Sequence, residues 1–412
     1  MNARKSLLSI AVLVAMSGAA FADNGTVNTS QNGDRNGLNI DQSYANGSTT
    51  TVTQTGADNK AGTAGASLTQ QGSSNTLKVE QSGTFNTAAA KQTGSGNKAT
   101  IAQVSDATLP ANTNQNASLT QGGVSNVASI NQQGTVYGTV GATIKQAVSG
   151  GQNNTGSISQ VESYSNAQAT LTQAGSWNNG SIEQFNVAAG TAGIDQSGNG
   201  HVAQIYQNDA FVNTVAVVQT GDNNNGAINQ GNTSYVNASI NQGGNNNVGY
   251  VEQNAASSGN ASLTQNGSFN QARAYQQSND GRANGLTADI KQSGTGNTAY
   301  SNQAGQFNDV KINQVGADNG LASVTQNGSD LKADVTQNWG SGNVSYTTQS
   351  GSYNEETLLQ QGFNNTANVT QTGSGSYGVA ANTVTLNQTG NLQSATVTQS
   401  GGASNSAVIV QR

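Results

Sequence analysis

Residues 68–103 read LTQQGSSNTLKVEQSGTFNTAAAKQTGSGNKATIAQ, and this stretch repeats one short pattern. A Gln recurs every eleven residues, a Gly follows each Gln by two positions, and an Asn follows it by five. The Gln residues are Gln70, Gln81, Gln92 and Gln103, and the Asn residues are Asn75, Asn86 and Asn97. Written from the Asn, the unit is N-x-A-x-φ-x-Q-x-G-x-x, where φ is Val, Ile or Leu. A fixed short period of this kind indicates a repeat architecture.

The pattern extends along the chain from Gln31 to Gln411. It has 32 Gln positions and 31 gaps, of which sixteen are 11 residues long, eight are 12, and seven range from 13 to 18. From Gln173 to Gln276 the gaps alternate between 11 and 12, so the natural period is 23 residues with two half-units. The longer gaps are predicted to be loops. The longest contains Pro110, the only proline, which could not donate to a sheet ladder.

The Asn, Ala, φ and Gln positions are two residues apart, which places them on one face of a β-strand. The φ position is Val, Ile or Leu in 27 of the 32 units, so this face is predicted to be buried. Buried carboxamides need partners, and columns of identical side chains supply them when strands stack parallel and in register. The predicted ladder residues are Gln70, Gln81, Gln92, Gln103, Gln173, Gln184, Gln207, Gln230, Gln253, Asn75, Asn86, Asn97, Asn178, Asn224 and Asn247.

These features predict an all-β fold: a flat β-solenoid with two strands per rung, about 16 rungs, and parallel in-register stacking of the cross-β, amyloid-like type. A Gly that follows many of these Gln residues by two positions, as Gly72, Gly83 and Gly94 do, permits a turn between strands. Solenoids expose unpaired strand edges at both ends and usually cover them with atypical capping repeats. Here the last unit, with Asn405 and Gln411, follows the pattern fully, and an early full unit contains Asn36 and Gln42. We therefore expect these four residues to be fibre-end contacts in a head-to-tail polymer.

Composition separates this chain from ordinary globular and disordered proteins. Of 412 residues, 8% are charged, against about 25% in typical domains. Disordered chains are usually strongly charged and rich in proline, whereas Asn/Gln-rich, weakly charged sequence is typical of β-stacking assemblies. The chain has no Cys, so disulfide bonds do not stabilise it.

The N-terminus is predicted to be a processing signal. Residues 1–22 contain Arg4 and Lys5, a short apolar stretch and an Ala20-Phe21-Ala22 cleavage site, the pattern of a Sec signal peptide. Residues 23–412 are then a single repeat domain, with 12 basic and 20 acidic residues and a net charge of −8. The absence of a basic patch argues against a nucleic-acid partner. No later segment is long and apolar enough to span a membrane, so an integral membrane protein is not expected.

The pattern N-x-A-x-φ-x-Q-x-G-x-x-N, with two half-units per rung, resembles the curlin repeat of curli fibre subunits. Segments 75–86 and 173–184 match it closely, and the resemblance covers essentially the whole predicted mature chain. It implies a major subunit of an extracellular amyloid fibre in the biofilm matrix, with roles in adhesion and aggregation. It also implies export through the periplasm of a diderm bacterium, and as partners a nucleator subunit and an outer-membrane secretion pore. The familiar subunits have about five rungs, so this chain has about three times as many.

Three alternatives remain at this stage. A monomeric secreted solenoid could act as an adhesin or an ice-binding protein, although the Thr array that ice binding needs is interrupted. A polysaccharide-active solenoid enzyme would need clustered carboxylates or basic residues in one groove, and the sequence shows none. A minor nucleator subunit would be expected to have a degenerate, basic last repeat, whereas this one is regular. No catalytic residue, cofactor or metal is predicted.

Several residues depart from the pattern. His201, the only His, replaces Asn on the inner face, and a lone His is a weak metal-site signal. Glu356 also falls on the inner face, where a local distortion is expected. Phe85, Trp177, Phe269, Phe307 and Tyr353 each lie four residues after a ladder Gln. Those aromatic residues are interpreted either as packing within the turn or as an apolar edge that bundles fibres.

Overall fold

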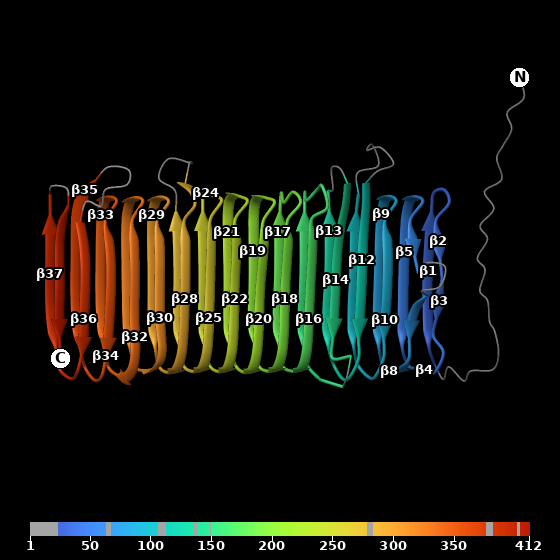
Figure 1. The fold of residues 1–412 in the computed structure, drawn as a ribbon. Coiled ribbons are helices and arrows are strands. Elements are labelled where there is room, and N and C mark those ends of the chain that lie inside the picture. The colour runs from blue at the N-terminus through green and yellow to red at the C-terminus, as the bar shows by residue number, and fades with distance from the viewer. Residues whose placement is uncertain are drawn as a thin grey trace, which may run out of the picture.

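The computed structural model describes residues 24–62, 67–105, 113–134, 138–148, 150–277, 283–375, 382–401 and 404–412. These residues form a flat, elongated stack of parallel strands with turns along both edges (Figure 1). No helix occurs within these ranges. The predicted signal peptide and Pro110 lie outside the described residues.

Two large sheets face each other. The strands of the first, sheet 1, are β1 (Thr26–Asn32), β5 (Thr49–Ala57), β9 (Thr76–Thr84), β11 (Lys98–Val104), β13 (Val127–Gln133), β15 (Thr155–Val161), β17 (Asn179–Phe185), β19 (Val202–Phe211), β21 (Asn225–Ser234), β23 (Val248–Asn254), β24 (Ala256–Ser257), β26 (Gln271–Gln277), β27 (Ala283–Asn284), β29 (Thr298–Gln306), β31 (Leu321–Ser329), β33 (Val344–Ser352), β35 (Thr366–Ser374) and β37 (Ser394–Ser400).

The strands of sheet 2 are β2 (Gly37–Leu38), β3 (Ile40–Asp41), β6 (Lys60–Ala61), β7 (Leu68–Gln70), β10 (Thr87–Gln92), β12 (Thr113–Gln121), β14 (Gly138–Gln146), β16 (Gln168–Ser176), β18 (Thr191–Asn199), β20 (Thr214–Asp222), β22 (Asn237–Asn245), β25 (Asn260–Ser268), β28 (Thr287–Thr295), β30 (Asp309–Asp318), β32 (Lys332–Ser341), β34 (Glu355–Gln361), β36 (Asn382–Thr389) and β38 (Asn405–Gln411). The short strands β4 (Ala45–Asn46) and β8 (Gly72–Ser73) pair with each other at one edge.

The chain alternates between the two sheets, so each turn of the solenoid contributes one strand position to each. Successive strands of a sheet pair in parallel with the repeat in register: β19 and β21 place Ile205 opposite Ile228 and Gln207 opposite Gln230. The chain thereby builds a β-solenoid of about 15 turns. The predicted all-β, parallel, in-register solenoid with two strands per rung is confirmed.

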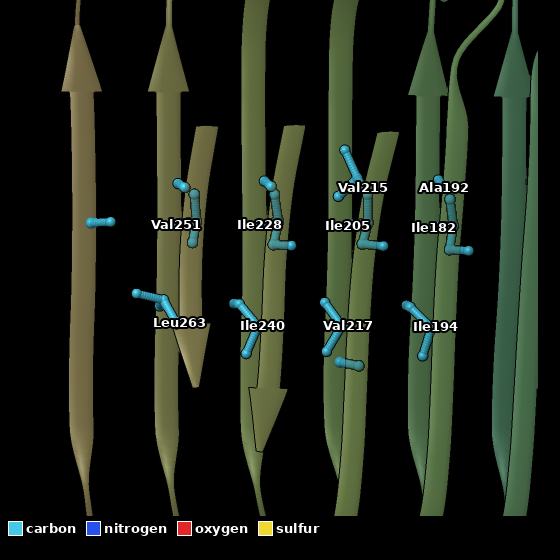
Figure 2. Packing of buried hydrophobic residues seen from close by; sticks show 14 of the residues in the cluster. Ile182, Ala192, Ile194, Ile205, Val215, Val217, Ile228, Ile240, Val251 and Leu263 are labelled. Carbon is cyan, nitrogen blue, oxygen red and sulfur yellow. The ribbon is translucent and has the colours of Figure 1, made fainter. Parts of the chain in front are cut away.

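The core is a single narrow layer between the two inner faces. Figure 2 shows Ile182, Ile205 and Ile228 of sheet 1 facing Ile194 and other apolar side chains of sheet 2. These residues are fully buried, while the alternate positions along the same strands face solvent. Because the side-chain period of a strand is two, one residue of slippage would expose the whole apolar column, which fixes the register.

The turns bring the backbones of neighbouring rungs into close contact. Gly351 has φ of 97°, and a Cβ at this position would lie 1.9 Å from the carbonyl oxygen of Gly373 on the next rung. Only glycine satisfies both the backbone conformation and the contact. The same stacking of a Gly on the next rung's carbonyl recurs along both edges of the solenoid.

Candidate functional site: the amide ladders and the end rungs

Each sheet contains a continuous column of hydrogen-bonded Gln side chains. In sheet 1, the Nε2 of Gln81 donates to the Oε1 of Gln103 at 2.9 Å and to the carbonyl oxygen of Lys60 at 3.1 Å. An interior Gln of this kind donates twice and accepts once, which satisfies a carboxamide that is almost fully buried. The sheet 1 column contains the predicted residues Gln81, Gln103, Gln184, Gln207, Gln230 and Gln253, and the sheet 2 column contains Gln70, Gln92 and Gln173.

An Asn column lies at the turns that lead into sheet 1. The Oδ1 of Asn224 accepts from the backbone N–H of Asn247 on the next rung at 2.9 Å. Its Nδ2 donates to the carbonyl oxygens of Thr220 and Gly244, both at 2.8 Å. The carboxamide therefore stabilises its own turn and the contact between rungs. The predicted residues in this column are Asn75, Asn97, Asn178, Asn224 and Asn247.

The corresponding column on the opposite edge is polar mainly near its two ends. It contains Asn36, Asn59 and Asn86 near the N-terminus and Asn354, Asn382 and Asn405 near the C-terminus. Many of the central rungs carry buried apolar residues at this position, among them Val140, Val236, Leu286 and Leu331. The shared repeat pattern did not predict this difference, although the residue six positions before most of the Gln residues already differs between the two half-units.

His201 takes the place of an Asn in the column at the turns that lead into sheet 1, and it is fully buried. Its backbone N–H donates to the Oδ1 of Asn178 at 3.0 Å, and its Nδ1 accepts from the backbone N–H of Asn224 at 3.2 Å. Its Nε2 lies 3.3 Å from the carbonyl oxygen of Ser197. A neutral imidazole with the proton on Nε2 thus reproduces the acceptor and the donor of an Asn side chain. Desolvation by burial lowers the pKa of His201 and favours this neutral form.

Glu356 lies on the inner face of β34, where the strands on either side carry Ala333 and Val384. Its Oε1 accepts from the Thr347 hydroxyl at 3.0 Å, while Oε2 has no partner among the described residues. Burial raises the pKa of Glu356 to about 8, so the carboxyl group is protonated at neutral pH. The prediction of a local distortion is wrong, since β34 pairs in register with the strands on both sides. Protonation accounts for the regular pairing because it removes the charge from the core.

The predicted end contacts lie on the first and last rungs. Gln42 donates to the Oε1 of Gln70 at 2.7 Å, and Asn36 donates to the carbonyl oxygen of Gly56 at 2.9 Å. At the other end, Gln411 accepts from Gln388 at 2.7 Å, and Asn405 donates to Asn382 at 2.7 Å. Each of these residues contacts its own neighbouring rung, and no described strand pairs with the outer edge of β38.

The last strand also has apolar residues on both faces. Ala407 and Ile409 point into the core, while Val408 and Val410 are 70% and 54% exposed on the outer face. Elsewhere in sheet 2 the equivalent outer positions are mainly polar, for example Thr385 and Asn387. These valines were not among the predicted site residues, although the run AVIV at 407–410 has the high β-propensity and low charge of an aggregation-prone strand.

The remaining polar chemistry is on the surface. Ion pairs such as Lys332–Glu355, at 3.0 Å, lie on the outer faces of the sheets. Across the described ranges, no group of three or more His, Cys, Asp or Glu side chains could hold a metal ion. In the same ranges, no helix has the length and apolarity required to cross a membrane.

The turn aromatics divide into two groups: Trp177, Phe269 and Phe307 are exposed, whereas Phe85 and Tyr353 are half-buried.

One family of known repeat proteins matches two segments of this chain. The family described as the curlin-associated repeat matches residues 72–104 and 283–316, and both segments lie within the stacked strands described above. No curated protein matches the chain. The matched repeats point to a structural protein rather than an enzyme, and they suggest a curli-type amyloid subunit. With the same Gln and Asn spacing repeated along both sheets, the chain is a curlin-repeat protein.

Proposed function

We propose that this protein is the structural subunit of an extracellular, curli-like amyloid fibre, in which molecules stack head to tail along the solenoid axis. The observation that carries the proposal is the continuity of the two Gln ladders, which run through the whole molecule and reach both end rungs. A further rung added at either end would extend the same ladders, backbone pairing and apolar core.

The end rungs are the least buried part of the fold, which supports this proposal. Every residue of β1 except the half-buried Gln31 is exposed, and Ile409 in β38 is only partly buried, whereas interior φ residues such as Ile228 are fully buried. Stacking a second molecule would bury these edges. Apolar burial contributes roughly 25 cal/mol per Å², and each new strand pairing adds a row of backbone hydrogen bonds.

The proposal includes the setting in which the fibre works. Residues 1–22 act as a Sec signal peptide, and the mature chain is exported through an outer-membrane pore to the cell surface. There a nucleator subunit starts fibres that serve adhesion, aggregation and the biofilm matrix. The proposed fibre needs no cofactor, because its stability comes from amide ladders and apolar packing.

The test is assembly of the purified mature chain, residues 23–412, without additives. We expect fibres after a lag phase that preformed fibre fragments abolish. Fibre diffraction should show reflections near 4.7–4.8 Å and near 10 Å, the strand and sheet spacings of cross-β structure. A chain that stays monomeric by size-exclusion chromatography for days at micromolar concentration would contradict the proposal and favour a monomeric adhesin. Growth that appears only when a second protein is added as the main fibre component would favour a nucleator role.

A further inference from the structure

The side-chain hydrogen bonds of both Gln ladders run in one direction. In sheet 1, Gln31 donates to Gln54, Gln54 donates to Gln81, and the series continues to Gln371, which donates to Gln399. In sheet 2 the series runs from Gln42 to Gln411. In each bond the lower-numbered Gln is the donor.

This direction is fixed by the backbone rather than by the ladder alone. Most Gln side chains use their second Nε2 hydrogen on a carbonyl oxygen of the opposite sheet, as Gln349 does with Lys332 at 2.9 Å and Gln360 with Val344 at 3.0 Å. Reversing one carboxamide would turn its Oε1 toward that carbonyl oxygen and leave two acceptors in contact. A buried acceptor pair of this kind costs the hydrogen bond and the desolvation of both groups.

The two ends of the molecule are therefore chemically different. On the first rung, the Oε1 atoms of Gln31 and Gln42 accept no hydrogen bond from any described residue, since both side chains donate inward. On the last rung, Gln399 and Gln411 donate to the carbonyl oxygens of Thr383 and Ser394, each at 3.1 Å or less, and their other Nε2 hydrogens have no described acceptor. The first rung is an acceptor face and the last rung is a donor face.

We propose that these faces bind each other in one register, with Gln399 donating to Gln31 of a second copy and Gln411 donating to its Gln42. This inference rests on the proposed fibre function and specifies how its subunits join. The partner of β37 is then β1 of the next molecule, and the partner of β38 is its β2–β3 segment.

In this register, residues of the same type also lie opposite each other at other positions. It places Asn405 opposite Asn36 and Ile409 opposite Ile40, the pairing found between interior rungs. Gly401 lies opposite Gly33, and a Cβ on Gly401 would meet nothing within 4 Å, which leaves room for the carbonyl oxygen of an incoming rung. Two identical ends could not join in this way, because acceptors would meet acceptors or donors would meet donors. The fibre is therefore polar, and its two ends offer different faces to incoming molecules.

The test uses a variant that has lost the donor face. In Gln399→Glu/Gln411→Glu, each carboxylate can still accept from Gln371 or Gln388 but offers no N–H to the next copy. It also loses the donation to the carbonyl oxygen of Thr383 or Ser394 in its own last rung. The variant keeps its acceptor face, so it can add to the donor end of a wild-type fibre and then block that end. Gln399→Met/Gln411→Met removes the same donors without adding charge. The matched control, Gln168→Glu/Gln204→Glu, makes the same composition change at exposed positions on the outer faces of β16 and β19, away from both end rungs.

Fluorescent wild-type monomer is added to immobilised wild-type fibre seeds with each variant at about one tenth of the monomer concentration, and both fibre ends are followed. With either donor-face variant, growth at one end should fall about tenfold or more, because each lost ladder bond weakens the next addition, and ~1.4 kcal/mol is tenfold in affinity. The other end and the control should keep the wild-type rate. Equal inhibition of both ends, or equal effects of the donor-face variants and the control, would overturn the polarity. Wild-type growth in the same chamber tests the fibre function separately, and hydrogen exchange of interior amides verifies that each variant is folded.

Discussion

His201 shows how one titratable residue can enter an amide column without breaking it. The neutral ring supplies an acceptor at Nδ1 and a donor at Nε2, the roles that Asn224 performs with its carboxamide one rung later. Protonation would place a second N–H opposite the backbone N–H of Asn224 and a positive charge in a buried site. The stack should therefore be sensitive to acid at this rung.

The pKa of His201 is lowered from its ordinary value of 6.5, so the folded state favours the neutral ring. The stabilisation is complete above pH 6.5 and is lost progressively as the pH falls below that value. We expect amide exchange at Asn224, corrected for intrinsic rates, to accelerate between pH 7.5 and pH 5 relative to Asn247. In His201→Asn the difference should disappear. An equal pH response in both proteins would mean that the ring does not act as an Asn substitute.

At Glu356, further along the stack, the stability should depend on pH in the opposite direction. Its pKa rises from 4.5 to about 8, so the folded state holds the proton more tightly than the unfolded chain. The associated stability is present below pH 4.5 and is lost as the pH rises through about 8. Exchange at Leu358, corrected in the same way, should therefore become faster from pH 5 to pH 9 in the wild type. Glu356→Gln keeps the shape without the titration and should be insensitive to pH in this range.

At the residue scale, the sequence predicted which side chains point inward better than it predicted their protonation states. The inward orientation of Gln207 or Ile228 follows from a period of two within each strand. The inward placement of Glu356 follows from the same period, but its tolerance does not, because it depends on Thr347 lying across the core to hydrogen bond the protonated group. That contact joins two strands of different sheets, and the repeat pattern carries no information about it.

At the element scale, the turns contain positions that require glycine and positions that accept other residues. Gly351 cannot be replaced because the next rung's carbonyl oxygen occupies the space of a Cβ. The position two residues after the turn glycine also has a left-handed backbone conformation, but it leaves room for a side chain. In three other turns this position is occupied by Asn223, Asn246 and Trp177, with φ of 56°, 56° and 63°. Asn tolerates this conformation well, whereas a bulky side chain is strained in it.

Trp177→Asn should therefore stabilise its turn by about 1 kcal/mol, since a left-handed conformation costs a non-glycine residue roughly 1–2 kcal/mol and Asn less. The Trp177 side chain is 64% exposed, so it loses little packing in the exchange. Slower amide exchange at Asn178 and Asn179 would show the gain. The reciprocal change, Asn223→Trp, should accelerate exchange at Asn224 and Asn225 by a similar factor. Faster exchange in Trp177→Asn would mean that contacts of the ring outweigh the backbone strain.

The register of these elements was predictable because the 23-residue period recurs without exception in the central part of the chain. The apolar residues in the column on the opposite edge were not predicted, because the shared pattern describes both half-units with the same Asn position. In the structure, the two half-units lie on different edges, and only the first edge keeps its Asn ladder through the central rungs. Val236 and Leu331 replace an Asn where neighbouring rungs bury them on both sides, which removes the need for a polar partner.

At the scale of the whole molecule, most of the stability is distributed over many equivalent rungs, whereas assembly depends on two. An interior carboxamide such as Gln230 lies between Gln207 and Gln253, so its loss leaves neighbouring amides short of one bond, at a cost of roughly 1–3 kcal/mol. The rest of the stack holds these neighbours in place. The last rung has neighbours on one side only among the described residues, and its outer surface is the proposed docking face.

The double variant Gln411→Ala/Asn405→Ala should therefore slow seeded elongation much more than the matched interior variant Gln230→Ala/Asn224→Ala. Both remove one Gln and one Asn from a ladder, so composition and local loss are alike. In the interior variant the loss falls within a folded molecule, whereas in the end variant it subtracts from the binding of each incoming subunit, with ~1.4 kcal/mol for every tenfold change in affinity. Elongation rates are compared with seeds and monomer of the same variant, at equal seed number. Equal rates would show that growth does not use the β38 rung as its template, and the head-to-tail arrangement would have to be replaced by lateral or interior docking.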